Sequence, residues 1–366
     1  MDHEEFKRIA YPELAELLAG RLSATPEPQP LDISPWIAQS LLQKSIRRGE
    51  AGLALRASAS LLRDDPDKLW RRLSVIAYED IGLGSLDLIM PTLIATSGKV
   101  VRRAFHGEWP VASAIVEGMA TARKDRSADN AYMVAAIHFQ YSGDRLSLTF
   151  RPIPELMRIA TGDGDIITRS IATIYAVGTD RCRTPGMRVR KGDPRYVFHA
   201  MREAGFPFTV VDLSERGSTQ FREPLPALMS LMSSVVPGHS TGWRPTERDD
   251  DIPPTTMIGE VPGWSLDWYT RPGRATIRAF LRHDTPTSRW LKANVAPRDR
   301  AEALGGLVFR VEGGLLRRRL QWEAGSYLRR TMETEAVGFG ITDASDVLDL
   351  LRNDLPLLNE ERRHVL

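Results

Sequence analysis

The chain has 366 residues, 42% of them hydrophobic and 26% charged, which is enough to bury the cores of two or three globular units. Its single cysteine, Cys182, excludes an internal disulfide framework and is typical of a reducing compartment. The acidic first residues, MDHEE, are unlike a signal peptide, and no run of about 18 apolar residues is present. We therefore predict a cytoplasmic protein without a membrane span.

The net charge of +2 is too small to indicate nucleic-acid binding by itself, but the charge is unevenly distributed. Residues 266–330 contain 13 Arg and one Lys against three Asp and three Glu, so this segment carries +8 and the rest of the chain −6. Arginine is favoured throughout, since only seven of the 49 basic residues are lysine. The composition explains many solvated arginines, but it does not explain their clustering.

The first 30 residues predict a short amphipathic helix over 1–22 and a proline-rich linker over 23–30. A helical unit is predicted over 31–145. Ser34 and Pro35 are typical of a helix start, because serine can accept a hydrogen bond from a free amide and proline loses no helical hydrogen bond there. Gly49 is a typical helix stop. Between them, apolar residues recur at helical spacing: Ile37, Leu41, Leu42 and Ile46.

Two further helices are predicted before residue 82. The first carries Leu53, Ala57 and Leu61 on one side, and the second restarts at Asp65-Pro66. It ends in the sequence YEDIGLG, residues 78–84, where Glu79 and Asp80 are adjacent and are expected to point about 100° apart on a helix. From residue 107, another helix leads to a basic turn and the sequence RSADNA, residues 126–131, before a further helix.

With these two segments, the chain resembles the C-terminal helical collar of the RarA/MgsA family, clamp-loader-like AAA+ ATPases that act at stalled replication forks. The resemblance covers about residues 33–140, and where family members often have Lys-Ser-Asn-Ala this chain has RSADNA. It implies that this unit self-associates, since the collar of that family holds a homotetramer together. It also implies that Glu79 and Asp80 cap or pack a helix end. A separate AAA+ ATPase is an implied partner.

No ATPase motif accompanies the resemblance. A Walker A loop needs Gly-x-x-x-x-Gly-Lys-Ser/Thr, whereas the single Gly98-Lys99 pair is followed by valine and lacks the earlier glycine. Only about 30 residues precede the resembling segment in this sequence. The histidines are scattered, without zinc-ligand spacing: His3, His106, His138, His199, His239, His283 and His364. We predict no cofactor, no metal and no enzymatic activity.

Two acidic clusters leave an alternative open, a metal-dependent nucleic-acid enzyme. Paired carboxylates can hold the divalent cations used by nucleases, and Asp163 and Asp165 form one cluster, while residues 249–251, including Asp250, form the other. The first cluster precedes a predicted helix, where aspartates satisfy free amides, and the second lies in a proline-rich loop, where charges are usually solvated. Both clusters therefore also have ordinary structural explanations.

The rest of the chain is predicted to be mainly helical with little β-structure. The middle region, 146–236, has predicted helices over 155–160, 166–177 and 194–204 and one predicted strand over 206–213. A loop or linker follows over 237–262. The C-terminal domain, 263–366, has predicted basic helices over 275–283 and 315–332 and a final helix from residue 345. The fold class is mostly α: a multi-helix collar-like array of the clamp-loader type, followed by a basic domain.

The C-terminal domain supplies the predicted DNA contact. One set of arginines recurs at helical spacing, a second is a consecutive run, and a third follows near Trp322 and Tyr327, which could stack on bases. The predicted residues are Arg271, Arg274, Arg278, Arg282, Arg317, Arg318, Arg319, Arg329 and Arg330. In the other interpretation these arginines pair with carboxylates of the same chain.

These features predict a non-catalytic accessory protein of DNA replication, recombination or repair that contacts single-stranded or fork-like DNA. The alternative to a DNA contact is a protein-interaction adaptor. The sequence DLPLL, residues 354–358, loosely resembles the peptide that binds sliding clamps, although it lacks the usual glutamine and a leucine-rich tail commonly docks on its own domain.

Overall fold

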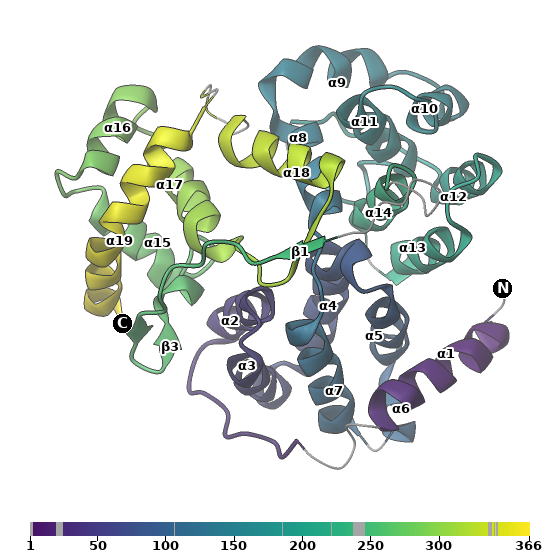
Figure 1. Ribbon diagram of the computed structural model, residues 1–366, viewed down its shortest axis with the longest axis horizontal. Coiled ribbons are helices and arrows are strands. Elements are labelled where there is room, and N and C mark those ends of the chain that lie inside the picture. The colour runs from purple at the N-terminus through teal and green to yellow at the C-terminus, as the bar shows by residue number, and fades with distance from the viewer. Residues whose placement is uncertain are drawn as a thin grey trace.

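The computed structural model describes residues 3–19, 25–105, 107–184, 186–220, 222–236, 246–335, 339, 341 and 343–366. Over these residues the chain is mostly helical with four short strands, which confirms the predicted fold class (Figure 1). Two hydrophobic cores are present. The larger runs from Leu14 to Met332, and the smaller is built from residues between Ile277 and Leu358.

The N-terminal part follows the sequence prediction closely. Helix α1 (His3–Ala19) precedes three helices that pack on one another: α2 (Pro35–Arg48), α3 (Ala51–Asp64) and α4 (Pro66–Ile76). The Ser34 hydroxyl accepts a hydrogen bond from the Ile37 amide, and Gly49 ends α2 in the left-handed region at φ +71°. The Asp65 carboxylate caps α4 through the Lys68 amide. The capping roles of Ser34 and Gly49 and the helix start at Asp65-Pro66 are those that the sequence predicted.

A π-helical turn over Ala77–Ile81 and two short 3₁₀ turns lead from α4 to α5 (Ile89–Thr96). Three helices follow: α6 (Lys99–Ala104), α7 (Glu108–Thr121) and α8 (Ser127–Ile137). Helix α7 packs across α2 and α3, while α8 contacts α11 and α14 of the middle region. The predicted boundary at residue 145 therefore does not coincide with a break in the core.

The middle region contains α9 (Ser142–Leu148), α10 (Ile153–Ala160), α11 (Ile166–Val177) and α12 (Pro194–Glu203), followed by α13 (Phe208–Gln220) and α14 (Leu225–Ser233). The predicted strand over 206–213 is wrong, because residues 208–213 form the first part of α13 and residues 206–207 lead into it. Its buried positions recur at helical spacing once the helix is followed past residue 213: Val210, Val211, Leu213, Ser214, Gly217 and Ser218.

The predicted loop over 237–262 lies partly outside the described residues. Its described part contains the short strands β1 (Thr246–Arg248), β2 (Met257–Ile258) and β3 (Val261–Pro262). Beyond it, α15 (Arg271–Phe280), α16 (Pro286–Asn294), α17 (Arg300–Val308) and α19 (Ser345–Val365) surround the smaller core, at the left of Figure 1. The predicted final helix from residue 345 is confirmed, and the predicted helix over 275–283 coincides with α15 for most of its length.

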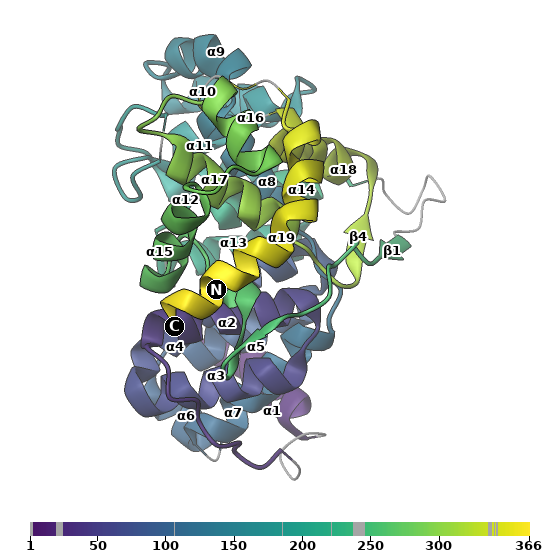
Figure 2. The same ribbon diagram turned by 90° about the vertical axis from the view of Figure 1, so that its left-hand side faces the viewer.

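Between α17 and α19 the chain leaves the smaller core and crosses to the larger one. This crossing segment, residues 314–335, contains β4 (Arg319–Gln321), which pairs antiparallel with β1, and α18 (Glu323–Arg330), which packs on α8 (Figures 1 and 2). The predicted helix over 315–332 is therefore wrong in its first half. The amides of Arg317 and Leu320 bond to the carbonyls of Arg47 and Lys124, so they are not available for a helix.

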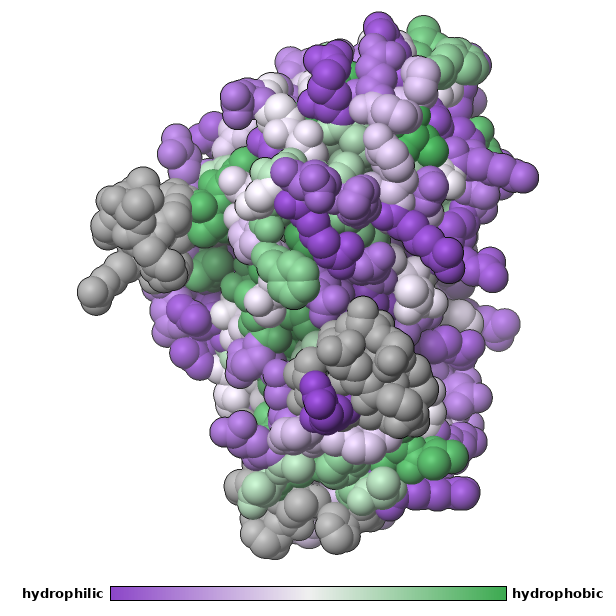
Figure 3. Space-filling model, turned by 90° about the vertical axis from the view of Figure 1, so that its right-hand side faces the viewer, coloured by the Kyte–Doolittle hydropathy of each residue, from purple (hydrophilic) through white to green (hydrophobic). Residues whose placement is uncertain are grey.

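Large apolar side chains also reach the surface. Val100 of α6, Tyr196 of α12 and Phe208 of α13 are exposed. Figure 3 shows one face of the molecule, on which apolar patches and a band near the lower end interrupt a largely polar surface. No helix in the described part of the chain is long and apolar enough to cross a membrane.

Candidate nucleic-acid interface and its charged support

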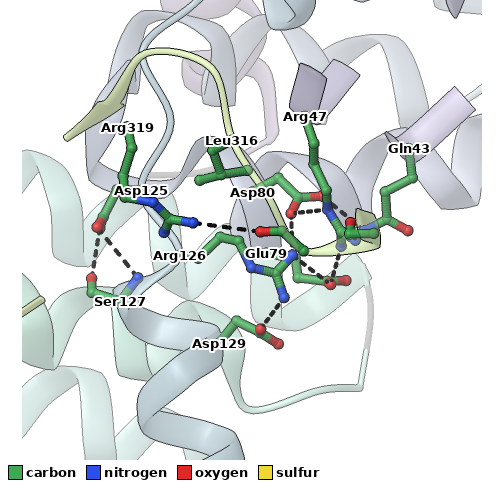
Figure 4. A network of polar contacts seen from close by, with 12 residues as sticks. Gln43, Arg47, Glu79, Asp80, Asp125, Arg126, Ser127, Asp129, Leu316 and Arg319 are labelled. Atoms are coloured by element: carbon green, nitrogen blue, oxygen red, sulfur yellow. Dashed lines mark hydrogen bonds and ion pairs between the residues drawn. The ribbon is translucent and has the colours of Figure 1, made fainter. Parts of the chain in front are cut away.

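The two segments that carry the family resemblance meet in a buried charged network. Asp80 is fully buried in the π-helical turn, and its carboxylate accepts hydrogen bonds from Gln43 Nε2 at 2.8 Å, from Arg47 Nε at 2.7 Å and from Arg126 (Figure 4). Burial raises the pKa of Asp80, but the two arginines outweigh it and hold that pKa below its ordinary value.

Glu79 binds the same two arginines. Its carboxylate lies 2.7 Å from Arg47 Nη2 and 3.2 Å from Arg126 Nη1, and Arg126 also binds Asp129. The two carboxylates were expected to point about 100° apart, and they nevertheless share partners because each guanidinium is broad enough to reach both. Phe309 closes the network, with its ring 5.2 Å from the Arg47 guanidinium and 5.4 Å from that of Arg126. The acidic pair is thus a packing element.

The glycines of YEDIGLG allow another backbone to approach closely. Gly82 has φ +47°, and a Cβ at this position would lie 2.5 Å from the carbonyl oxygen of Asp125. A Cβ at Gly84 would lie 2.5 Å from the carbonyl oxygen of Arg123. Only residues without a side chain fit at such distances. The motif therefore seats the turn over residues 123–125 against the end of α4.

The turn over residues 123–125 also binds the crossing segment. The Lys124 amide donates to the Arg318 carbonyl at 3.0 Å, and the Leu320 amide donates to the Lys124 carbonyl at 2.8 Å. Trp322 Nε1 donates to the Asp125 carboxylate at 3.2 Å. Lys124 is itself buried, with its ammonium on the carbonyls of Ala120 and Ala122, and burial lowers the pKa of Lys124 to about 8.

Most arginines of the crossing segment are used inside the molecule. Arg317 lies 2.6 Å from Asp249 and Arg318 lies 3.2 Å from Glu247, both pairs being exposed. The Arg319 side chain is only 7% exposed and binds Asp250 at 2.6 Å, and Arg329 binds the same carboxylate from the other side at 2.6 Å. These side chains follow the interpretation in which arginines pair with carboxylates of the same chain. Their contact with DNA stays a prediction.

The arginines of α15 lie differently. Thr270 caps this helix through the Gly273 amide, and its apolar side, including Ile277 and Phe280, is buried in the smaller core. The opposite side carries Arg271, Arg274 and Arg278, and Arg282 follows in the turn two residues beyond the end of the helix. Among the described residues, none of these arginines has a carboxylate partner: Arg271, Arg274, Arg278 and Arg282.

We call these four arginines the α15 row. Arg271, Arg278 and Arg282 are exposed, and Arg274 is partly buried with one 3.5 Å contact to the Trp268 carbonyl. Tyr269, directly before the helix, is also exposed. A phosphate can approach exposed, unpaired guanidinium groups without displacing a carboxylate first. The sequence had predicted three sets of arginines. The α15 row differs from Arg317 and Arg318, which are also exposed, in having no carboxylate partner among the described residues.

The acidic clusters have structural partners. Asp165 caps α11 through the amides of Ile167 and Thr168, and Asp163 is exposed beside it. Asp249 and Asp250 bind the arginines of the crossing segment. Within the described residues there is no group of three or more His, Cys, Asp or Glu side chains arranged to hold a metal ion.

The DLPLL segment belongs to α19. Leu355 and Leu358 are buried in the smaller core, so the side chains that would have to enter a groove on a sliding clamp are occupied. The segment follows the other interpretation, in which a leucine-rich tail docks on its own domain.

The last of the arginines predicted to contact DNA, Arg330, is exposed at the end of α18.

Two buried ion pairs were not predicted from the sequence. Lys44 of α2 binds Asp267 at 2.5 Å and so joins the larger core to the start of the C-terminal domain, and burial lowers the pKa of Lys44. Arg362 of α19 binds Glu312 at 2.7 Å. The partners are 223 and 50 residues apart, and only the long-range fold brings them together.

Comparison of the chain with known proteins gives no relative. No protein-family model, no curated protein and no solved structure matches it.

Proposed function

We propose that this chain is a non-catalytic accessory protein of DNA replication, recombination or repair. It contacts DNA through the α15 row and self-associates through the collar-like residues 31–145. The observation that carries the DNA contact is the α15 row itself, three arginines on one face of α15 and Arg282 just beyond its end, without carboxylate partners among the described residues. Guanidinium groups bind phosphate oxygens strongly, and these have no carboxylate partner to give up first.

The collar assignment is supported by the way its two motifs meet. YEDIGLG supplies Glu79, Asp80 and the two close-approach glycines, while the other motif supplies Arg126 and Asp129. The two motifs are about 40 residues apart in the sequence but share one network of buried charges. They are expected to occur together, because losing either one would leave buried charged groups of the other without partners. The two segments on which the resemblance rests are therefore in contact in this chain.

Fluorescence anisotropy with labelled single-stranded and duplex DNA across a salt series tests the DNA contact. Two double variants remove the same charge: Arg278→Ala with Arg282→Ala, from the α15 row, and Arg317→Ala with Arg318→Ala, from the ion-paired arginines. We expect the first to weaken binding and to reduce the slope of log K against log salt by about 0.7 to 0.9 for each phosphate that the variant no longer neutralises.

The second double variant is the control, because its arginines are neutralised by Asp249 and Glu247. It should change affinity much less than the first. An equal reduction of affinity in both would mean that only net charge matters, and it would contradict the assignment of the α15 row. Absence of binding by the wild-type protein at low salt would contradict the DNA contact altogether.

A protein-interaction adaptor is the second candidate, and one observation favours it. Four of the nine arginines predicted to contact DNA are ion-paired within the chain: Arg317, Arg318, Arg319 and Arg329. In that function the chain pairs with a separate AAA+ ATPase. Salt-insensitive or absent DNA binding, together with comigration with such an ATPase in size-exclusion chromatography, would favour the adaptor.

A further inference from the structure

A polar pocket of about 270 Å³ lies between the N-terminal end of α8 and the crossing segment. Its walls come from three directions: α8 with the residues just before it, strand β4, and α18 with the turn that follows it. The volume is near the lower end of the range of about 300–1,000 Å³ that is typical of small-molecule sites. None of the functions considered above uses this pocket.

Asn130 is the first sign that the pocket accepts a ligand. Its backbone amide bonds to the Arg126 carbonyl at 2.8 Å, which fixes the residue in the first turn of α8. The residue is only 6% exposed and lines the pocket, yet its side-chain amide makes no hydrogen bond with any described residue. The amide is therefore held at the pocket wall with its two N–H donors and its carbonyl acceptor available to a molecule in the pocket.

Two anchored arginines supply further donors. Arg319 uses Nε and Nη2 on Asp250, and Arg329 uses Nη1 on Asp250 and Nε on Glu333. A guanidinium carries five N–H groups, so Nη1 of Arg319 and Nη2 of Arg329 keep donors that no described residue accepts. Their ion pairs hold both side chains in place at the pocket wall. The hydroxyl of Ser326 adds a donor from α18.

The donors of the lining favour an anion. Arg126, Arg319 and Arg329 are compensated by carboxylates, so the preference comes from the N–H groups that Arg319 and Arg329 keep at the pocket wall and from the Asn130 amide, rather than from net charge. The first turn of α8 adds the positive end of a helix dipole. A carboxylate ligand would use two acceptor atoms in one plane, whereas donors here come from three walls. This arrangement suits the three terminal oxygens of a tetrahedral phosphate.

We propose that this pocket binds a phosphate monoester, with Asn130, Arg319, Arg329 and Ser326 as donors to its oxygens. The monoester is carried either by a free mononucleotide or by the 5′ end of a DNA strand. The proposal does not depend on the α15 row, and each can fail without the other.

Isothermal titration calorimetry with AMP, inorganic phosphate and adenosine tests the proposal. We expect AMP and phosphate to bind and adenosine, which lacks the phosphate, not to bind. Asn130→Ala should weaken AMP binding about tenfold, the loss expected for one hydrogen bond to a charged group. Asn353→Ala, the same substitution at an exposed position of α19, should bind AMP as the wild type does.

A second variant and a second pair of probes complete the test. Asn130→Asp places a negative charge in the pocket and should abolish AMP binding, while circular dichroism shows that the variant is folded. A 5′-phosphorylated oligonucleotide that binds more tightly than its unphosphorylated form, in an Asn130-dependent way, identifies the DNA end as the source. AMP binding without such a preference identifies a free nucleotide. No binding of AMP or phosphate at millimolar concentration, or equal binding by Asn130→Ala, would overturn the proposal.

Discussion

Asp80 is the residue on which the buried network depends. It balances Arg47 and Arg126, and both guanidinium groups are almost fully buried. Removing the carboxylate would leave both cations with only Glu79 and Asp129 nearby. We expect Asp80→Ala to lower the free energy of unfolding by about 3–5 kcal/mol, the cost that follows when one partner of a buried ion pair is removed.

Urea unfolding followed by circular dichroism measures this effect. Glu79→Ala is the control, because the Glu79 side chain is 18% exposed and water can replace it. Its cost should be clearly smaller. Equal costs for the two substitutions would show that Asp80 has no special place in the network.

The glycines of YEDIGLG give a second prediction. At Gly82 an alanine Cβ would meet backbone at 2.5 Å, and φ is +47°, so Gly82→Ala is expected to destabilise the protein by more than about 1 kcal/mol. At Gly52, inside α3, a Cβ meets nothing within 4 Å. Gly52→Ala should therefore stabilise by about 0.5–1 kcal/mol.

Thermal unfolding of these two single variants compares the same substitution in two surroundings. Opposite shifts in Tm are expected, downward for Gly82→Ala and upward for Gly52→Ala. Two shifts of the same sign would mean that the approach of residues 123–125 does not constrain the motif.

Lys124 predicts a pH dependence of stability. Burial lowers the pKa of Lys124 from 10.5 to about 8, so between these pH values the unfolded chain binds the proton that the folded chain has released. The free energy of unfolding of the wild type should therefore rise with pH across this window, by at most about 3 kcal/mol. Below pH 8 both states hold the proton, and this contribution is flat.

Lys124→Met isolates this effect. The variant keeps the length of the side chain but cannot titrate, so the difference in unfolding free energy between wild type and variant should change between about pH 8 and 10 and stay constant between about pH 6 and 7.5. Groups that titrate elsewhere in the chain cancel in this difference. A difference that is constant over the whole range would contradict the lowered pKa of Lys124.

At the residue scale, the sequence predicts contacts between neighbouring residues but not contacts between residues far apart in the chain. The caps at Ser34 and Gly49 and the helix start at Asp65-Pro66 follow from the chemistry of neighbouring residues, and they are confirmed. The pairing of Asp80 with Arg126 crosses 46 residues, and no spacing rule gives it. The available signal was an acidic pair between an apolar helix and two glycines, since a charge that becomes buried there requires a partner.

At the scale of secondary-structure elements, the two errors have one physical cause. The run FPFTVVDL is rich in residues that favour strands, and the consecutive arginines 317–319 are compatible with a helix, so local preference was misleading in both places. Tertiary contacts decided the outcome. The apolar positions of α13 face α14 and α12, and the amides around Arg319 bond to Arg47 and Lys124. Long periodic helices were predicted well because their burial pattern is visible in one window.

The arrangement of elements also explains why the α15 row differs from the other arginines. The crossing segment runs between two parts of the molecule, so its cations are compensated by β1 and the loop after it, which carry Glu247, Asp249 and Asp250. Helix α15 uses one face for the smaller core, and no described carboxylate pairs with the arginines on the other. Both regions are rich in arginine, and they differ only in whether carboxylates of the folded chain lie next to the guanidinium groups.

At the scale of the whole molecule, the collar-like residues 31–145 lead to a prediction about self-association. Trp36 at the start of α2 is 62% exposed, with the Lys68 ammonium 4.9 Å from its ring, and it is a large apolar side chain in the unit that the resemblance assigns to assembly. Exposed aromatic residues are favoured at the centre of protein interfaces. We expect the chain to form a homo-oligomer, a tetramer by the resemblance, through a surface that includes Trp36.

Size-exclusion chromatography with multi-angle light scattering measures the mass, which should be four times the 40.9 kDa of one chain. Trp36→Ser is expected to shift the population towards smaller species at a given concentration. Phe208→Ser is the matched control, because Phe208 is 69% exposed and lies on α13, outside the collar-like residues, so its removal should leave the mass unchanged. A wild-type mass of one chain would contradict self-association, and equal shifts in the two variants would place the interface outside the collar-like unit.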